Sequence, residues 1–394
     1  MSRLVQWSVL RRLDIGLLTA VFALLMVGIL FVFSAGYRGE GLPVSELYLR
    51  QLGWMAVGLV CMLGVAVVDY RTWINLGWWG YALGLALLVF TLWPGIGVTM
   101  YGARRWLDLG FVKVQPSEFV KIAVVVALAR LLGRPGRNLN QIRYGVFAVA
   151  LITAPMLLIM RQPDLGTALV LPPVALAMMY VAGVPGRFLK RIVLAGGLAV
   201  AVVLGAVVLP PRLGATPAEQ ERIARWVGLT PYQRERLLVF LDNERDPLNA
   251  GWNKAQSQIA VGSGGFWGKG YLNGTQNLLG FLPRTVAPTD FVFSVIAEEM
   301  GFVGSVGLLF LYAVVIVSGA RTALAATDAV GRLLALGLMT LLFCHVFINI
   351  AMTMGLMPIT GIPLPLISYG GSFMVGTMAA LGLLQGVYSR SRQG

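Results

Sequence analysis

The sequence predicts an all-α polytopic membrane protein with about ten transmembrane helices and one long extracytoplasmic loop that carries short helices. Hydrophobic residues make up 57% of the 394 residues and charged residues only 12%, whereas soluble domains carry about 25% charged residues. Apolar runs long enough to cross a bilayer recur along the chain. Because no linker separates them, we expect a single transmembrane domain over residues 1–394.

Each expected span is a mostly apolar run close to the roughly 20 residues that a membrane helix needs. The first follows Arg11 and Arg12, is too long for the apolar core of a signal peptide and has no small-residue cleavage site at its end. We therefore expect it to remain in the membrane. The expected spans are 13–35, 49–68, 74–93, 116–132, 144–160, 166–184, 191–209, 292–319, 330–353 and 366–388.

Basic residues divide unevenly between the two sides of this arrangement, and cytoplasmic loops are the side that is rich in Lys and Arg. The poorer side has six in or beside its short loops, namely Arg38, Arg50, Arg104, Arg105, Lys113 and Arg161. The side that holds both termini has fifteen, namely Arg3, Arg11, Arg12, Arg71, Arg130, Arg134, Arg137, Arg143, Arg187, Lys190, Arg191, Arg321, Arg332, Arg390 and Arg392. Both termini are therefore expected in the cytoplasm. The net charge of +14 reflects this topology, and we expect no nucleic-acid partner.

The connection over about 210–290 is the one long external segment, and it is too long for a passive connector. It contains two amphipathic pieces, Pro217–Val227 and Tyr232–Leu241, and a glycine-rich stretch, Val261–Tyr271. We expect short helices and re-entrant elements that lie on the outer leaflet of the membrane.

A first polar group opens the fourth span, where Gln115, Glu118 and Lys121 recur every third residue on one helix face. One interpretation is that Glu118 and Lys121 merely neutralise each other within the membrane. The other is that they form the polar wall of a cavity that opens outward. Just before them, Arg104, Arg105 and Lys113 are cations on the side that is poor in basic residues.

Those external cations suit an anionic ligand, and phosphate is the natural one because guanidinium groups offer it forked donors. Asp164, in the short external turn before the sixth span, has two alternative roles. It caps that helix, or it forms a salt bridge with Arg161 or with a member of the first polar group.

Asp290, Ser294 and Glu298 are spaced to form one stripe on a helix that we expect to begin near Asp290. A carboxylate in the first turn is favoured by the helix dipole, so capping alone is one explanation of Asp290. The other is a functional carboxylate at the outer face. Glu298 and Glu299 lie deeper, and we expect them to be neutralised by an internal partner such as Lys121.

His345, Asn349 and Thr353 form a polar stripe on the ninth span, and we interpret His345 as a buried hydrogen-bonding residue. With one histidine and two cysteines, both inside expected spans, the chain offers no histidine-based metal cluster, Ser–His–Asp triad or disulfide framework. The uncharged segment Gly361–Ser372, which includes Ser368, is rich in glycine and proline. Irregular backbone at membrane depth is tolerated inside protein or along a wet cavity, so we expect it to line a cavity.

Taken together and in this order, these segments resemble the SEDS family (shape, elongation, division, sporulation) of bacterial cell-wall proteins, and within it the RodA-like members. The likeness covers nearly the whole chain. One departure is that Pro283 reaches Asp290 through a segment two residues longer than the family's Leu-Pro-Glu-x-His-Thr-Asp-Phe motif, with Arg284 and Pro288 in place of its acid and histidine. The matching stretches are Gly102–Lys121, Arg161–Thr167, Ala255–Gly270, Thr289–Glu299 and Gly361–Ser372.

The resemblance implies a peptidoglycan glycosyltransferase that polymerises lipid II at the outer face of the bacterial cytoplasmic membrane. It also implies a class B penicillin-binding protein as the partner that supplies transpeptidation. No cofactor is evident from the residues, and they do not reveal whether a divalent cation assists. The rival function is a flippase for the lipid-linked precursor, which would need a midplane site reachable from both sides. A third is a non-catalytic scaffold.

The resemblance also suggests roles for individual residues. Asp290 is expected to be the general base. The expected substrate contacts are Arg104, Arg105, Lys113, Glu118, Lys121 and Ser368, with the three external cations as candidates for the pyrophosphate. The expected structural polar network consists of Arg161, Asp164, Glu298, Glu299 and His345.

Overall fold

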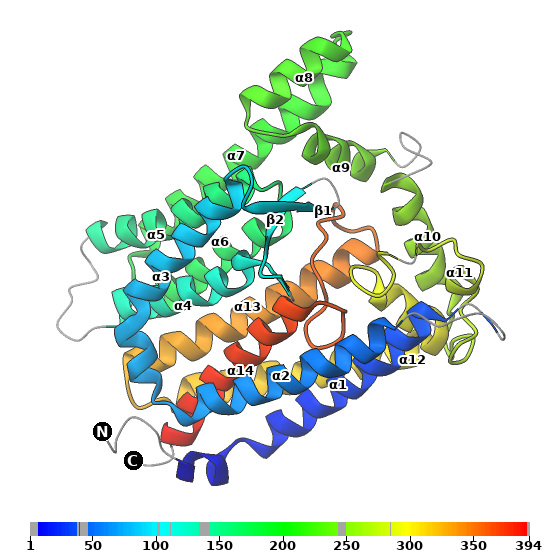
Figure 1. The fold of residues 1–394 in the computed structure, drawn as a ribbon. Coiled ribbons are helices and arrows are strands. Elements are labelled where there is room, and N and C mark those ends of the chain that lie inside the picture. Colours follow the sequence, from blue (N-terminus) through cyan, green and yellow to red (C-terminus); the bar gives the residue numbers. More distant parts are fainter. Residues whose placement is uncertain are drawn as a thin grey trace.

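The computed structural model describes residues 7–37, 39, 46–100, 103–110, 112–133, 142–242, 250–283 and 285–391. Every expected span coincides with a long helix, with ends that differ by a few residues (Figure 1). Eight of these described helices are long and apolar enough to cross a membrane, while α4 and α6 have 17 residues each. The long helices are α1 (Ile15–Gly36), α2 (Leu47–Val67), α3 (Tyr70–Leu92), α4 (Pro116–Leu132), α5 (Ile142–Arg161), α6 (Leu165–Val181), α7 (Gly186–Arg212), α12 (Val292–Ala325), α13 (Ala329–Thr353) and α14 (Gly371–Ser391).

Helix α13 lies at the centre of the bundle, where it packs against α4, α6, α12 and α14. Around it, α1 runs along α12, α2 along α14 and α3 along α4 (Figure 1). The short 3₁₀-helix η1 (Trp7–Arg12) meets α14, so the start and end of the described chain lie at one end of the bundle. Helix α7 stands apart, because almost none of its apolar surface is covered.

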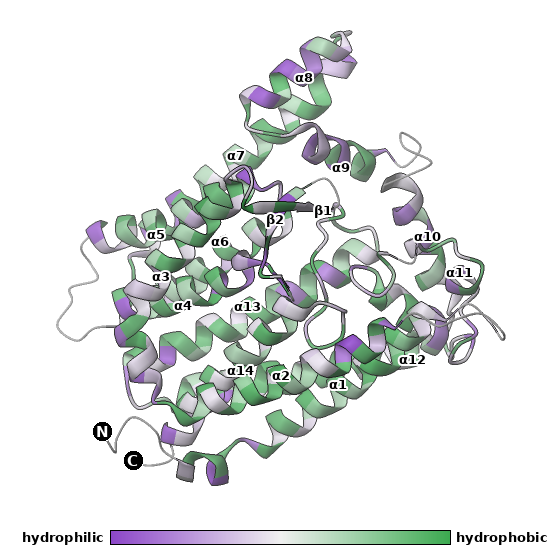
Figure 2. Cartoon of the chain, viewed as in Figure 1, coloured by the Kyte–Doolittle hydropathy of each residue, from purple (hydrophilic) through white to green (hydrophobic). Residues whose placement is uncertain are grey.

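The long connection contains four short helices, as the sequence predicted: α8 (Pro217–Trp226), α9 (Pro231–Leu241), α10 (Ala250–Ser263) and α11 (Thr275–Leu278). Helices α8 and α9 begin at threonine capping boxes, in which the threonine and a residue three positions later each satisfy the other's backbone N–H. Figure 2 shows hydrophilic residues gathered on α8 and α9, in contrast to the apolar long helices.

The glycine-rich stretch forms a loop that packs against a break in α12. Gly301 has φ +64° and ψ −159°, which interrupts the helix. The loop supplies the missing backbone partners: Phe302 N donates to Gly265 O at 2.9 Å, and Gly270 N donates to Glu299 O at 2.9 Å. Irregular backbone is therefore satisfied by protein, as burial in an apolar bundle requires.

A small antiparallel sheet was not predicted, because we expected helices alone. Its strands, in the order β1-β2-β3, are β1 (Gly97–Met100), β2 (Ala103–Asp108) and β3 (Lys113–Val114). The strands are short, so their period-2 pattern gives little signal beside the long apolar runs. The turn after β2 is set by Asp108, whose carboxylate accepts from Gly110 N at 2.8 Å. The sheet bridges α3 and α4 at the end of the bundle opposite η1.

We expect Gly301→Ala to lower the stability of the fold by about 1–3 kcal/mol or more, because this φ/ψ region is almost restricted to glycine. A Cβ at Gly301 would also lie only 2.3 Å from Gly268 N. The midpoint of thermal unfolding in detergent measures the effect. Gly307→Ala is the matched control, since it lies in the same helix with open space around it, and it should be neutral or slightly stabilising. Equal midpoints for the two variants would contradict the role of the break.

Candidate active site

Asp290 lies in a loop, not in the first turn of a helix as predicted. Helix α12 begins at Val292, and Asp290 N closes a separate turn by donating to Val286 O at 2.9 Å. The expected stripe along one helix is therefore wrong for Asp290. Ser294 instead meets Ser257 of α10, with 2.7 Å between the two hydroxyl oxygens. The turn from Val286 to Asp290 is thus complete before the helix starts.

Two buried side chains fasten this loop. Ser368 is fully buried, its hydroxyl donates to Thr289 O, and it accepts a hydrogen bond from Leu364 N at 2.8 Å. Asn349 of α13 donates to Asp290 O at 3.0 Å. The structure therefore places Ser368 behind the loop, where it holds Asp290's neighbour, and not at a surface where it would touch a substrate.

Arg236 of α9, a cation from the long connection, has the largest electrostatic effect of any charged side chain on Asp290. A Cβ at Gly361 would lie 3.3 Å from Asp290 Oδ2 and 3.5 Å from Arg236 Nη1, so the two groups meet over this glycine. Arg236 Nη1 donates to Ile359 O at 2.9 Å, and its guanidinium lies 4.4 Å from the centre of the Tyr232 ring. Its position is thus fixed by both the bundle and its own helix.

Burial and charge act in opposite directions on Asp290. Burial raises the pKa of the Asp290 carboxyl above its ordinary value, and the positive charges of Arg236 and Arg105 partly lower it again. Burial lowers the pKa of Arg236, while Tyr232 and Asp290 raise it. The Asp290 carboxylate is consequently a stronger proton acceptor than an exposed aspartate, and it still has cations beside it that favour its charged form.

Asp164 fulfils both roles that the sequence left open. It caps α6 by accepting from Thr167 N at 3.1 Å, and it accepts from Gln115 Nε2 at 3.1 Å. It also pairs with Arg105 of β2, whose Nη1 lies 3.8 Å from Asp164 Oδ1. The expected alternative partner Arg161 is exposed, and Asp164 pairs with Arg105 instead.

We expected three external cations at the site. Of these, the structure places Arg105 there, paired with Asp164. Arg104 lies at a β-bulge between β1 and β2, and its side chain packs beside Gly97 of β1. Lys113 is exposed and lies across the sheet from Asp108. The predicted cluster of Arg104, Arg105 and Lys113 is therefore replaced by Arg105 and Arg236.

Sequence reasoning missed Arg236. A signal was present, because Arg236 follows Tyr232 by four residues in a predicted amphipathic piece, which puts both on one helix face. What the pattern could not show is that α9 returns to the bundle. The bond from Arg236 to Ile359 O and a 3.4 Å bond from Gln233 Nε2 to Met160 O provide that attachment.

Glu118 and Lys121 form a buried ion pair, with Lys121 Nζ 2.8 Å from Glu118 Oε2. Lys121 also lies 2.7 Å from His345 Nε2. Because His345 Nδ1 is 2.8 Å from Leu341 O, which can only accept, Nδ1 carries the proton and Nε2 accepts from Lys121. The Phe373 ring covers the cation at 5.5 Å. This arrangement fits mutual neutralisation, extended by the histidine.

Glu298 and Glu299 do not meet Lys121, contrary to our expectation. Lys269 of the glycine-rich loop pairs with Glu298 at 2.6 Å, and Ser34 of α1 donates to Glu299 at 2.5 Å. The prediction was wrong because a cation in the long connection was available, and Lys121 was already engaged on α4. These two glutamates stabilise the packing of the glycine-rich loop.

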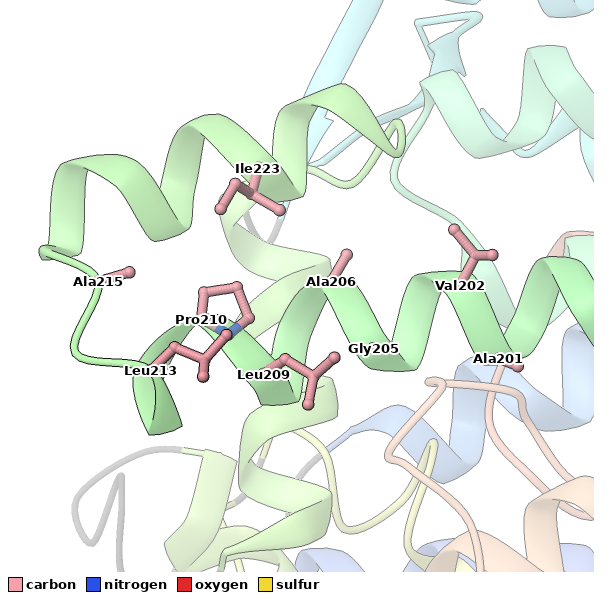
Figure 3. A pocket seen from close by; sticks show the side chains of 9 residues that line it. All are labelled: Ala201, Val202, Gly205, Ala206, Leu209, Pro210, Leu213, Ala215 and Ile223. Atoms are coloured by element: carbon pink, nitrogen blue, oxygen red, sulfur yellow. The ribbon is translucent and has the colours of Figure 1, made fainter.

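One hollow among the described residues lies away from these charges. It is a groove of about 580 Å³ between α7 and α8, shown in Figure 3. Catalytic pockets combine apolar walls with a few convergent polar groups, so we place the candidate site at Asp290. Among the described residues, no three His, Cys, Asp or Glu side chains are grouped as metal ligands. The groove is lined by Ala201, Val202, Gly205, Ala206, Leu209, Pro210, Leu213, Ala215 and Ile223.

Comparison with protein families matches residues 15–393 to the FtsW, RodA and SpoVE family, described as cell cycle proteins. The peptidoglycan glycosyltransferase MrdB of Escherichia coli K12 is 38% identical over 380 residues, which cover 96% of this chain and 94% of that protein. The peptidoglycan glycosyltransferase RodA of Treponema pallidum is 36% identical, with 96% and 98% covered.

Solved structures agree with the sequence matches. One, described as "structural coordination of polymerization and crosslinking by a peptidoglycan synthase complex", aligns with a TM-score of 0.75 at 33% identity, over 97% of this chain and 99% of that one. The crystal structure of the rod shape determining protein RodA of Thermus thermophilus aligns with a TM-score of 0.67 at 29% identity, over 97% and 98%.

Proposed function

This chain belongs to the FtsW, RodA and SpoVE family of cell cycle proteins, and we propose that Asp290 and its two flanking arginines are its active site. The chain is an integral membrane protein of the peptidoglycan glycosyltransferase type, since relatives covering more than nine-tenths of it carry that name. One observation carries the assignment: the half-buried Asp290 carboxylate lies near Arg236 over Gly361, and the charges of Arg236 and Arg105 both act on it.

The reaction joins the saccharide heads of lipid II. Asp290 accepts the proton of the acceptor 4-hydroxyl, the freed oxygen attacks the anomeric carbon of the donor, and the bond to the pyrophosphate breaks. The leaving pyrophosphate gains negative charge, and the guanidinium groups of Arg236 and Arg105 stabilise it. Asp164 holds Arg105 in place from the start of α6. Asp290, the two arginines and Asp164 thus each have a role in this reaction that matches their chemistry.

The position of the cluster favours glycosyl transfer over transport. Its members come from β2, the beginning of α6, α9 and the loop before α12. Because successive helices cross the membrane in opposite directions, these ends lie on one side of the membrane. A flippase needs a site near the midplane that opens to both sides in turn, whereas these charges gather at one end.

We further propose that this end faces outward and that both termini lie in the cytoplasm. The asymmetry of basic residues supports the orientation, and the meeting of η1 with α14 supports a shared side for the two ends. Bacterial cells place such a chain in the cytoplasmic membrane, where lipid II is used from the outer leaflet.

The partner that we propose is a class B penicillin-binding protein, which would crosslink the strands that this chain makes. Support comes from the related structure described as a synthase complex that coordinates polymerization and crosslinking. Large apolar surfaces on the outer helices leave room for a further span beside lipid, and α7 is almost entirely uncovered.

Asp290→Asn should reduce polymerisation by about 10²–10⁴-fold, because the amide keeps the shape but cannot act as a base. The assay is glycan formation from labelled lipid II by purified protein together with its partner. Glu221→Gln is the control, since that exposed carboxylate pairs with Arg225 on the surface and should matter little. Normal polymer from a well-folded Asp290→Asn protein would refute the mechanism.

Arg236→Gln should move the acidic limb of the pH–rate profile to higher pH. A base works when deprotonated, so activity falls as pH drops through its pKa, and losing a neighbouring cation raises the pKa of Asp290 further. Rates normalised to the plateau at high pH isolate this shift from the loss of pyrophosphate binding. Arg234→Gln, on the same helix and bonded to Gln220, should leave the limb in place. An unshifted limb in Arg236→Gln would rule out this electrostatic coupling.

Cysteine at Trp226 of α8 should react with a membrane-impermeant maleimide in intact cells, and cysteine at Arg187 should react only after lysis. Both positions are exposed, and they belong to opposite sides in the proposed orientation. The parent protein carries Cys61→Ser and Cys344→Ala so that the introduced thiol is the one labelled. The reverse pattern would place the active site in the cytoplasm and overturn the assignment.

A further inference from the structure

We propose that Asn349 of α13 is a positioning residue for Asp290: it fixes the backbone from which the base projects. The inference rests on the proposed function of Asp290 and deepens it, because neither that function nor the expected polar network assigned Asn349 a task. It concerns the stripe of His345, Asn349 and Thr353, which otherwise has no part in the reaction.

Asn349 is fully buried, and its amide nitrogen donates twice, to Asp290 O at 3.0 Å and to Ile362 O at 2.7 Å. Both partners are carbonyl oxygens, which can only accept, so the amide orientation follows from chemistry. One side chain therefore ties the loop that carries the base to the irregular segment behind it. The bond reaches the base residue itself, whereas Ser368 holds its neighbour Thr289.

The helix that presents Asn349 is itself firmly held at the turns on either side. One turn earlier, His345 accepts from Lys121 of α4, and one turn later the Thr353 carbonyl accepts from Ser257 of α10 at 2.7 Å. Successive members of the stripe are about 6 Å apart along the axis, at 1.5 Å per residue. Asn349 is thus a hydrogen-bond donor held in a fixed place, and its bond to Asp290 O sets the position of the loop.

Such precision matters because a general base must be within hydrogen-bond reach of the proton that it takes. A displacement of about 1 Å can lower a rate by about 10²-fold. Without the bond to Asn349, rotation of the Asp290 peptide would carry the carboxylate away from its place beside Arg236. The loss would appear in turnover more than in substrate binding, because Asn349 itself is buried away from any ligand.

The chain contains a close chemical match that serves as a control. Asn277 of α11 is also buried, and its amide nitrogen also donates to two backbone carbonyls, Ser34 O at 2.7 Å and Tyr37 O at 3.4 Å. It ties the long connection to α1, and neither of these two bonds reaches the turn from Val286 to Asp290 that carries the base. Asn277→Leu therefore removes the same kind of double bond without touching Asp290.

The experiment compares Asn349→Leu, Asn349→Asp and Asn277→Leu in the full chain with its partner, and measures kcat, KM for labelled lipid II and the midpoint of thermal unfolding. We expect Asn349→Leu to lower kcat about 10- to 100-fold with KM within about twofold of the parent. Asn277→Leu should lower the thermal midpoint comparably and keep its kcat. Asn349→Asp preserves size but loses both donors, so it should follow Asn349→Leu, and it serves alone if the leucine variant does not fold.

Three results would overturn the inference: an unchanged kcat in both Asn349 variants, a rise in KM at constant kcat, or an equal loss of kcat in Asn277→Leu. Asp290→Asn, measured in parallel, separates the two levels of the argument. If Asp290→Asn is inactive while the Asn349 variants turn over normally, Asp290 is still supported as the base, but the positioning role of Asn349 is refuted. If Asp290→Asn is itself active, the proposed base falls first, and Asn349 has nothing to position.

Discussion

Charge inside an apolar helix bundle is unfavourable unless each ion meets an opposite charge or a polar partner. Much of this structure follows from that constraint. Lys121 sits between Glu118 and His345 in the middle of the bundle, and Lys269 reaches Glu298 from the glycine-rich loop. Asp290 meets Arg236 over Gly361. In two of the three groups the cation comes from the long connection, which is therefore part of the bundle and not an appendage to it.

The same constraint shapes the backbone. Irregular segments at membrane depth need partners for their N–H and C=O groups, and two described segments receive them from another irregular segment or from buried polar side chains. The break at Gly301 is closed by the glycine-rich loop, and the loop before α12 is closed by Ser368 and Asn349. The buried polar side chains thus form hydrogen bonds with backbone peptide groups as well as with each other.

The long helices could be predicted because hydrophobicity and length are local properties, and α4 even begins and ends where the sequence indicated. The partners of buried charges could not, because they depend on which distant segment returns to the bundle. Lys121, a lysine inside an expected span, was the partner expected for Glu298 and Glu299, whereas Lys269 lies in a loop whose path the sequence does not reveal. The position of Asp290 outside the helix was also not predicted. Its backbone N–H closes a turn on Val286 O, and this turn ends before α12 starts. The family resemblance suggested Asp290 as the base, and the fold added Arg236 near it.

The break at Gly301 has a mechanical consequence. A continuous helix transmits tilt along its whole length, and membrane helices tilt when bilayer thickness changes. In α12, the segment from Val292 to Met300 is separated from the longer remainder and is held by the glycine-rich loop. The same loop also bonds the first residues of the remainder, because Phe302 N donates to Gly265 O and Val303 N donates to Phe266 O. Any tilt that the remainder takes up is therefore passed to the glycine-rich loop as well as to the end beside Asp290.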